Sequence, residues 1–561
     1  MSTNRRVFEA MLSRRTTRRR AMQAGAIGSG IIGISFAGAP TRQYVRSVSA
    51  QGTPEATPMA SPVDISRQPS AQFGVYPFQL GVASGDPTAH SVVLWTRLAP
   101  TPIDGGGMDP IPYELRWEIA TDRDFANVVQ RDVVVAAPTL AHAVHVDVTG
   151  LQPGTEYFYR FIVGDEVSQT GRTKTAPEAG QTVDALNVAF VSCSNYEHGY
   201  FVAYRDLATK NLDLVLHLGD YIYEYGYNDY HVREPENLRW VGGGETLTLD
   251  LYRNRYATYR TDADLQAAHA SAPFAVTWDD HEVENNYADS ISENKDPADE
   301  FLQRRADAYQ AYYEHMPLRP SSMPTGPDMQ LYRHIAFGDL LDITILDTRQ
   351  YRSDHPSGDD FVPRTPNSTN PTTSLPGLDQ ERWLLRHLDA STSTWNAIAQ
   401  QVIMADIVVP DTTGGGGGAP TYYNDVWSGY PASRQRILEH IAAAGTSNPI
   451  VLTGDIHTSW ANDIPVDFDK AGAPALVTEY VCTSITAGGP EPDTWGSQLA
   501  GAYPYVKFFD PRHGGYSTAH ITADRWTTDF FVVDDMEDAA SGVTKIATFV
   551  TESGVPGAQK A

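Results

Sequence analysis

Four short apolar segments of this chain each end in side chains that can bind metal ions. The segments, each with the residues that follow it, are 187–191 with Cys193, 214–218 with Asp220 and Tyr223, 274–278 with Asp279, Asp280 and His281, and 449–453 with Asp455 and His457. Ligands of open α/β sheets collect at the carboxyl ends of strands, so we expect these side chains to meet at the edge of a single sheet. Such a set suits two cations about 3.5–4 Å apart, which hold a phosphate group and activate a water molecule.

Each motif has a plainer interpretation when it is taken alone. An Asp that follows a strand and a Gly, as Asp220 does, often only caps a helix. A lone Cys such as Cys193 is usually a buried core thiol. The adjacent acids Asp279–Asp280 repel each other unless a cation or hydrogen-bond donors lie beside them, although a surface turn would also tolerate them. Asp455 and His457 are two residues apart and therefore share one face of a strand.

The donor types indicate which cations fit if the four segments converge. A carboxylate such as Asp220 can bridge two ions. A phenolate from Tyr223 and a thiolate from Cys193 favour a charged transition metal such as ferric iron, whereas carboxylates and Asn amides favour a hard cation such as calcium.

The elements around these motifs indicate at least two domains. Residues 73–176 read as short strands separated by turns, and residues 151–160 resemble the end of a fibronectin-type β-sandwich. From about residue 185 strand-like runs alternate with helical stretches such as 300–314, which is typical of an α/β domain and extends to about residue 535. Residues 536–561 form a C-terminal segment whose relation to the site is open, and the glycines at 414–418 predict a loop.

The N-terminus is predicted to be an export signal. Residues 1–50 contain a basic stretch and then a mild apolar stretch from Ala21 to about Ala39, and the pair Arg14–Arg15 resembles a twin-arginine signal. A membrane anchor is disfavoured because glycines dilute the apolar stretch. Residues 51–72, rich in Thr, Pro, Ser and Ala, read as a flexible linker. We therefore expect a secreted protein that uses the twin-arginine translocation machinery and has no stable membrane anchor.

The composition excludes some partners. The chain has 561 residues and a formal net charge of -27, and this acidity argues against duplex nucleic acid or an anionic membrane as a partner. The two cysteines, Cys193 and Cys482, could form a disulfide in an exported protein or remain buried thiols.

Five stretches together resemble the PhoD-like alkaline phosphatase family, and the resemblance spans roughly residues 73–535. They are 193–201, 217–226, 278–287, 346–352 and 452–457. The family is similar in its core to the purple acid and calcineurin-like phosphatases. The resemblance implies a four-layer α/β/β/α metallophosphoesterase domain preceded by a small fibronectin-like or immunoglobulin-like β-sandwich. It also implies a centre of Fe³⁺ and Ca²⁺.

The resemblance also assigns roles to residues. The implied iron ligands are Cys193, Asp220, Tyr223 and His457, with Asp220 bridging to calcium. The implied calcium ligands are Asp280, Asp455 and one Asn of the pair Asn285 and Asn286. Spacing does not distinguish the two, and we take Asn286 as the ligand. His281 is expected beside the leaving oxygen as a hydrogen-bond donor or general acid. Arg349, Arg352 and Asn285 are candidates for contacts with the substrate phosphate, although a structural role for the arginines is an equal alternative.

The resulting expectation is an alkaline phosphatase that hydrolyses phosphate monoesters, and also phosphodiesters, by attack of a metal-bound hydroxide on phosphorus. One alternative is a dedicated phosphodiesterase of the phospholipase D type. Another is a catalytically dead binding protein with the same fold. A third alternative is the same enzyme with two Zn²⁺ ions in place of iron and calcium.

Overall fold

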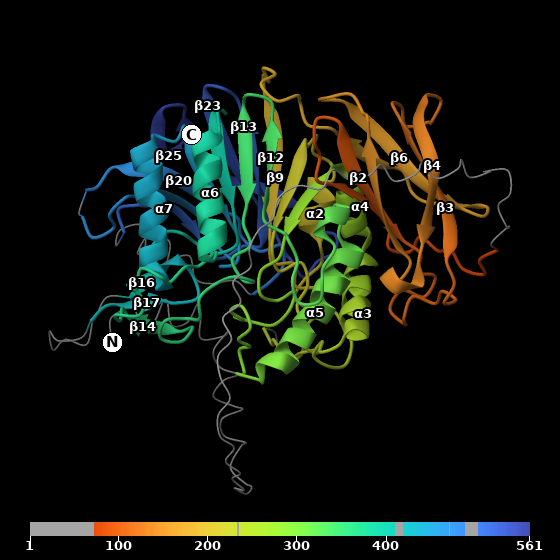
Figure 1. Cartoon of the computed structure of the whole chain (residues 1–561), viewed down its shortest axis with the longest axis horizontal. Helices are drawn as coiled ribbons and strands as arrows, with labels where there is room; N and C mark the ends of the chain where they lie inside the picture. Colours follow the sequence, from red (N-terminus) through yellow and green to blue (C-terminus); the bar gives the residue numbers. More distant parts are fainter. Residues whose placement is uncertain (1–71, 233–234, 410–418, 471, 489–502) are drawn as a thin grey trace, which may run out of the picture.

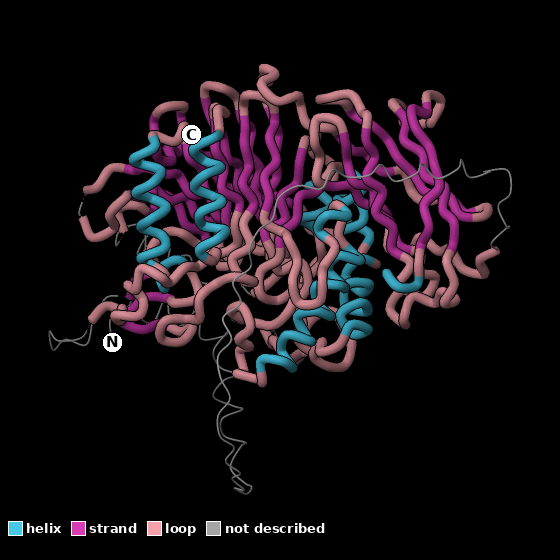
Figure 2. The backbone as a smooth tube through the Cα atoms, viewed as in Figure 1, coloured by secondary structure: helices cyan, strands magenta, loops and turns pink. Residues whose placement is uncertain are grey.

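Two β-sheets packed face to face form the centre of the molecule, and helices cover both outer faces. The structure is a computed structural model that describes residues 72–232, 235–409, 419–470, 472–488 and 503–561. Figures 1 and 2 show the helices in two groups, one at the left of the view and one at its lower right, and each group shares a buried core with one of the two sheets. The expected four-layer α/β/β/α fold is therefore confirmed. The predicted signal (1–50), nearly all of the predicted linker (51–72) and the glycines at 414–418 lie outside the described residues.

The larger sheet contains three of the four predicted strand–motif segments. Its strands, in spatial order, are β25 (Val555–Lys560), β24 (Val543–Glu552), β23 (Arg525–Val533), β22 (Gly515–Ile521), β9 (Leu186–Val191), β10 (Leu214–Leu218), β11 (Phe274–Thr277), β1 (Val82–Gly85), β2 (Ser91–Arg97) and β5 (Ala143–Thr149). Strands β9, β10 and β11 are adjacent and parallel, so their carboxyl ends lie side by side.

The smaller sheet contains the fourth segment. Its strands, in spatial order, are β12 (Arg333–Phe337), β13 (Leu341–Ile345), β15 (Trp395–Ala399), β18 (Pro449–Thr453), β20 (Ala475–Val481), β19 (Ser459–Pro465) and β21 (Val506–Asp510). Strands β13, β15, β18 and β20 are parallel. A small separate sheet consists of β14 (Phe361–Pro363), β17 (Thr421–Tyr423) and β16 (Val408–Val409).

The parallel strands are continuously apolar because both of their faces are buried. In β9, Val188 and Phe190 belong to the core between the two sheets, whereas Ala189 and Val191 belong to the core under the helices. The helices over the larger sheet are α2 (Val202–Leu207), α3 (Leu249–Arg260), α4 (Ala263–Ser271) and α5 (Ala298–His315), and those over the smaller sheet are α6 (Leu378–Ala390) and α7 (Pro431–Ala444). Short 3₁₀ turns lie at η1 (Pro138–Leu140), η2 (Pro320–Ser322) and η3 (Trp427–Gly429).

Local sequence signals explain the limits of the longer helices. Helix α5, predicted at 300–314, has Asp299 and Glu300 in its first turn, where acidic side chains complement the helix dipole. Its buried residues Phe301, Ala308 and Tyr312 recur at helical spacing and form the face that packs on the sheet. Helix α7 begins with Pro431 in its first turn, and its last residue, Ala444, is followed by Gly445, which adopts the left-handed conformation.

The N-terminal region forms a β-sandwich in which a separate small sheet packs against the last strands of the larger sheet. The separate sheet contains β4 (Val128–Ala136), β3 (Tyr113–Ala120), β6 (Glu156–Val163) and β7 (Glu166–Val167), and β8 (Gly171–Lys174) pairs with β6. It shares a buried core with β1, β2 and β5. Since β1 pairs with β11, this sandwich is continuous with the sheet that carries the site.

The C-terminal segment predicted at 536–561 is part of the larger sheet. It provides β24 and β25, which extend the sheet beyond β23. In Figure 1 these strands, coloured blue, lie at the opposite end of the molecule from the N-terminal strands, coloured orange. Within the described residues, no helix combines the length and the apolar character that crossing a membrane requires.

We expect Trp526→Ala to destabilise the fold strongly. Trp526 is fully buried in the core between the sheets and packs edge-on against Trp395, with ring centroids 5.8 Å apart. Loss of a buried aromatic side chain of this size lowers the free energy of unfolding by about 3–5 kcal/mol. Urea denaturation followed by circular dichroism measures the change. The control Trp240→Ala removes a side chain that is 62% exposed and should change stability by less than about 0.5 kcal/mol.

Candidate metal centre

The four predicted motifs meet where the two sheets pack together. The ends of β9, β10 and β11 bring Cys193, Asp220 and the stretch 279–281 to one edge of the larger sheet. Asp455 and His457 follow β18 of the smaller sheet. The expectation that all of them lie on a single sheet is therefore wrong. The site lies between two sheets because the end of β18 packs against the loop after β9, where Gly454 contacts Ser192.

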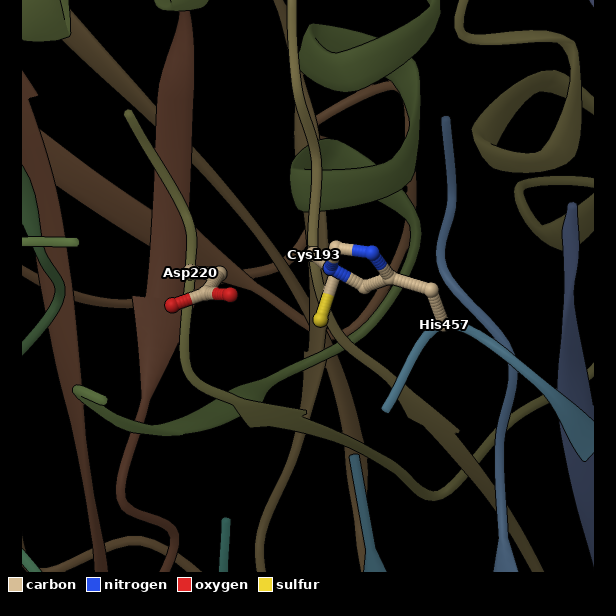
Figure 3. A group of neighbouring side chains, drawn as sticks. All are labelled: Cys193, Asp220 and His457. Atoms are coloured by element: carbon tan, nitrogen blue, oxygen red, sulfur yellow. The ribbon is translucent and has the colours of Figure 1, made fainter. Parts of the chain in front are cut away.

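One group combines sulfur, oxygen and nitrogen donors. Ligand atoms of Cys193, Asp220 and His457 all lie within 4.8 Å of one another, and Figure 3 shows the three side chains gathered from separate segments. The hydroxyl of Tyr223 donates to Asp220 Oδ2 at 3.0 Å and lies 3.1 Å from His457 Nε2. Cys193, Asp220 and Tyr223 are buried, whereas His457 is partly exposed. This is the set that the sequence comparison with the family assigned to iron.

Two further groups contain mainly oxygen donors, and Asp220 belongs to both. Ligand atoms of Asp220, Asp280 and His281 lie within 4.8 Å of one another, as do those of Asp220, Asp279 and Asp455. Asp220 is therefore the common member of all three groups at this centre. Asp279, which sequence reasoning did not select as a ligand, belongs to one of these groups.

The structure separates the two candidate asparagines. The backbone N–H of Asn286 donates to Asp280 Oδ2 at 2.8 Å, and its side-chain oxygen Oδ1 is buried without a hydrogen-bond partner. Asn285 instead directs its side-chain amide to Glu293 Oε1 at 2.9 Å. Spacing alone left this choice open, and the geometry favours Asn286 as an oxygen donor beside Asp280.

The backbone at the site is strained. Of the seven predicted ligands, five adopt positive φ angles, namely Cys193 (61°), Asp220 (55°), Asn286 (51°), Asp455 (62°) and His457 (59°). Residues other than glycine rarely adopt this conformation, and such strain concentrates at functional sites. The conformation turns the chain sharply after each strand, so that the side chains point toward a common centre instead of continuing along the sheet.

The glycines of the two Gly-Asp motifs permit this close approach. A Cβ atom on Gly219 would lie 2.7 Å from the backbone nitrogen of Asp279, and one on Gly454 would lie 2.6 Å from Cβ of Ser192. The φ angle of Gly219 is also positive, at 101°. Both glycines are therefore required by contact between neighbouring strand ends.

Burial and mutual repulsion dominate the electrostatics of the centre. Burial, with further contributions from Asp280 and Asp279, raises the pKa of Asp220 well above its usual value. Burial and the neighbouring Asp220 likewise raise the pKa of the Cys193 thiol. Asp280 differs: despite its burial, Arg349 and His281 lower its pKa. Without cations the ionised forms of Asp220 and Cys193 are costly, and bound cations would reverse this cost.

The two arginines proposed to contact phosphate are buried within the protein. Arg349 Nε donates to Asp279 Oδ1 at 2.6 Å, and its other nitrogens bind Asp425 at 2.8 and 2.9 Å. Arg352 also binds Asp425, at 2.8 Å. Both side chains are fully buried, so the structure does not present them to a substrate. The carboxylates of Asp279 and Asp425, which the sequence analysis did not connect with these arginines, neutralise their charge.

Two buried glutamates organise the site, and sequence reasoning overlooked both. Glu224 accepts from His281 Nδ1 at 2.7 Å and from the backbone N–H of Asn285 at 3.0 Å. Glu282 accepts the backbone N–H groups of Asp220, Tyr221 and Asp279 at 3.2, 2.5 and 2.9 Å. The sequence did contain a signal, because both glutamates lie within the recognised motifs 217–226 and 278–287.

The surroundings of the second cysteine, Cys482, indicate a structural role. Cys193 and Cys482 are both buried and free, so the alternative of a disulfide between them is not realised. The Cys482 thiol donates to the carbonyl of Thr453 at 3.3 Å, and burial raises its pKa to about 12. It belongs to the core between the two sheets.

The residues present fit a pair of cations. Asp220 Oδ1, Asp279 Oδ2 and Asn286 Oδ1 are buried oxygens without hydrogen-bond partners. Buried polar atoms are normally satisfied, so oxygens left unpaired in a cluster of acids indicate a cation site. The set of thiol, phenol and imidazole and the set of carboxylates and amide match two cations of different hardness.

Comparison with known proteins agrees with this architecture. Residues 188–530 match the sequence profile described as PhoD-like phosphatase, and residues 64–177 match that of the PhoD-like phosphatase N-terminal domain. Alkaline phosphatase D of Bacillus subtilis (strain 168) is 47% identical over 490 residues, which cover 87% of this chain and 83% of that protein. The solved structure of PhoD superposes with a TM-score of 0.84 at 47% identity and covers 87% of this chain and 93% of the other. The chain belongs to the PhoD-like phosphatase family.

Proposed function

We propose that this protein is a metal-dependent phosphoesterase that hydrolyses phosphate monoesters and also acts on phosphodiesters. The observation that carries the proposal is the position of Asp220, which is shared by a group of mixed sulfur, nitrogen and oxygen donors and by groups of oxygen donors. A carboxylate in this position can bridge two cations. Membership of the PhoD-like phosphatase family and the 47% identity to an alkaline phosphatase support the same activity.

The proposed ligands divide between two cations. Cys193, Tyr223 and His457 would hold Fe³⁺, Asp280, Asn286 and Asp455 would hold Ca²⁺, and Asp220 would bridge the two. The unpaired Oδ1 atoms of Asp220 and Asn286 support their part in this set. When bound, the cations supply positive charge that holds a phosphate ester and lowers the pKa of a coordinated water. A pair of Zn²⁺ ions is the alternative, and visible absorption of the purified protein distinguishes the two.

The chain's own residues position the substrate's leaving group. His281 lies beside Asp220 and Asp280 and is held by Glu224 through Nδ1. This contact fixes the ring, and despite burial the carboxylates of Glu224, Asp280 and Asp220 raise the pKa of His281. The protonated ring carries a hydrogen on its second nitrogen as well, which is then available as a donor to the leaving oxygen. Packing of the ring against Tyr223, with centroids 4.2 Å apart, restricts it further. Glu224 is therefore a positioning residue that acts through His281.

Arg349 has a positioning role in this proposal. It lies 3.5 Å from Asp280 Oδ2 while it binds Asp279 and Asp425. Its positive charge offsets part of the repulsion among the acids and keeps Asp280 ionised, so that Asp280 remains a cation ligand in the absence of substrate.

The proposed setting of this activity is outside the cytoplasm. The paired arginines Arg14–Arg15 and the weakly apolar stretch that follows support export by the twin-arginine route. This route carries folded proteins, which suits a chain whose metal centre is assembled from segments between residues 193 and 457. The substrate would then be a phosphate ester outside the cell.

Phosphate release before and after chelation tests the proposed function. We expect the purified protein to contain iron and calcium and to release phosphate from p-nitrophenyl phosphate. Treatment with a calcium chelator should abolish this release, and added Ca²⁺ should restore it, because the oxygen-donor groups would lose their cation. Relative rates on p-nitrophenyl phosphate and bis(p-nitrophenyl) phosphate then measure the preference for monoesters or diesters.

Matched variants make this test specific to the site. Asp220→Asn should lose bound metal and turnover together, whereas Asp379→Asn, which changes a side chain that is 91% exposed, should leave both unchanged. Absence of turnover by metal-replete protein would refute the enzyme proposal and favour a binding protein with the same fold.

Visible absorption tests the identity of the first cation. A tyrosinate bound to ferric iron absorbs visible light, whereas a zinc site is colourless. We expect the purified protein to be coloured and Tyr223→Phe to lose the band while it keeps its fold, as judged by circular dichroism. A colourless active protein that contains two zinc ions per chain would replace iron and calcium in the proposal. Tyr230→Phe, which changes a tyrosine whose ring centroid lies 6.2 Å from that of Tyr223, is the control and should keep the band.

The leaving-group dependence of His281→Asn tests the donor role. Removal of a positioned donor should lower kcat on the order of 100- to 10,000-fold for an alkyl phosphate, whose leaving oxygen needs a hydrogen bond. The effect should be much smaller for p-nitrophenyl phosphate, whose leaving group is already stable as an anion. Equal losses on both substrates would contradict the assignment. Glu224→Gln should show the same dependence in weaker form, because it acts only through His281.

A further inference from the structure

A second group of metal-binding side chains lies far from the centre described above. Ligand atoms of His334, Asp342 and His387 all lie within 4.8 Å of one another. His334 is on β12, Asp342 is the second residue of β13, and His387 is near the end of α6. The metal centre lies at the carboxyl end of the parallel strands, whereas Asp342 lies at the amino end. The two groups are therefore at opposite ends of the strands of the smaller sheet.

Strand register places these three residues on one face of the sheet. Ala336 pairs with Asp342 in the antiparallel β12–β13 ladder, so His334, two residues before Ala336, is a diagonal neighbour of Asp342. The alternate residues Ile335 and Ile343 face the core between the sheets, so His334 and Asp342 face outward. Helix α6 lies over this face through Leu384 and Leu388, which brings His387 above the two strands.

The distances are close to those of a bound transition metal. His387 Nε2 lies 3.0 Å and His334 Nδ1 lies 3.8 Å from Asp342 Oδ1, and the two imidazole rings are 4.1 Å apart. Ligands on a tetrahedral ion with bonds of about 2.0–2.1 Å are separated by about 3.3 Å. The two distances to Asp342 Oδ1 lie on either side of this value.

The exposure of the three residues suits a site with one open position. The side chain of Asp342 is only 10% exposed, whereas that of His334 is 49% exposed. His334 also lines a cavity of about 420 Å³ together with Arg333 and Tyr332. An ion bound by these side chains would therefore be coordinated by a nearly buried carboxylate and would remain accessible to solvent.

We propose that His334, Asp342 and His387 bind a Zn²⁺ ion in a separate site with a solvent-accessible fourth position. Two imidazoles and one carboxylate are ligands that zinc prefers, and three protein ligands with one open position are a common zinc arrangement. The group offers too few oxygen atoms for calcium, which takes six to eight.

Zinc uptake by the holoenzyme tests the proposal. The full-length protein, purified with its own metals, is equilibrated with micromolar Zn²⁺ and analysed for all metals. We expect one additional zinc per chain with no loss of the metals already present, and a raised Tm. His387→Ala should weaken this uptake by more than about 100-fold, because even outer partners of a metal site change affinity by about 10–100-fold. It should also remove the rise in Tm.

A matched histidine provides the control. His440 Nε2 lies 2.8 Å from Asp389 Oδ1, a pair like that of His387 and Asp342, but it belongs to no three-residue group in the described part of the chain. His440→Ala should therefore keep the additional zinc. Phosphate release should be unchanged in both variants, which shows that the metal centre is intact.

Two outcomes would overturn the proposal. One is wild-type protein that takes up no zinc beyond its own metals, and the other is equal uptake by wild type and His387→Ala. If His387→Ala does not fold, Asp342→Asn replaces it, since this variant keeps the size of the side chain and removes its charge. Equal zinc uptake by a folded Asp342→Asn variant would refute the site in the same way.

Discussion

Repulsion among buried carboxylates is the constraint that shapes the catalytic half of this molecule. Asp220, Asp279, Asp280 and Asp455 are brought within reach of one another at the junction of two sheets, and all four are buried. Such a cluster is unstable unless positive charge lies within it. The protein supplies one guanidinium, from Arg349, and the unpaired oxygens of Asp220 and Asp279 remain for cations. The clustering of these buried carboxylates therefore explains both the geometry of the site and its need for metal.

The backbone is adapted to hold this cluster in place. Five predicted ligands adopt left-handed conformations that cost energy in any residue other than glycine, so the surrounding structure must impose them. Glu282 contributes by accepting three backbone N–H groups from the ends of β10 and β11, and glycines at 219 and 454 let the strand ends touch. Large buried cores on both faces of each sheet provide the stability that offsets this strain.

The partners of a charged side chain distinguish residues that act on a ligand from those that position others. Arg349 and Arg352 have the charge expected for phosphate binding, yet Asp425 holds both of them inside the protein. Histidines show the same distinction. His281 is fixed by Glu224 within the metal centre, whereas His334 and His387 share a carboxylate at the other end of the strands of the smaller sheet, next to solvent. The same residue types therefore perform different tasks according to their neighbours.

Much of the fold and part of the site were predictable from sequence because their signals are local. Apolar runs such as 214–218 indicated strands, the stretch 300–314 was expected to be helical, and the polar residues after each strand identified the candidate ligands. Tertiary structure alone decided that β18 belongs to the opposite sheet, that Asn286 binds Asp280 through its backbone N–H while Asn285 binds Glu293, and that Asp425 binds two arginines more than 70 positions away along the chain. It also decided that His334, Asp342 and His387 meet. The physical reason is that these contacts depend on how sheets and helices pack, and residues that come together only through packing leave no periodic pattern in the sequence.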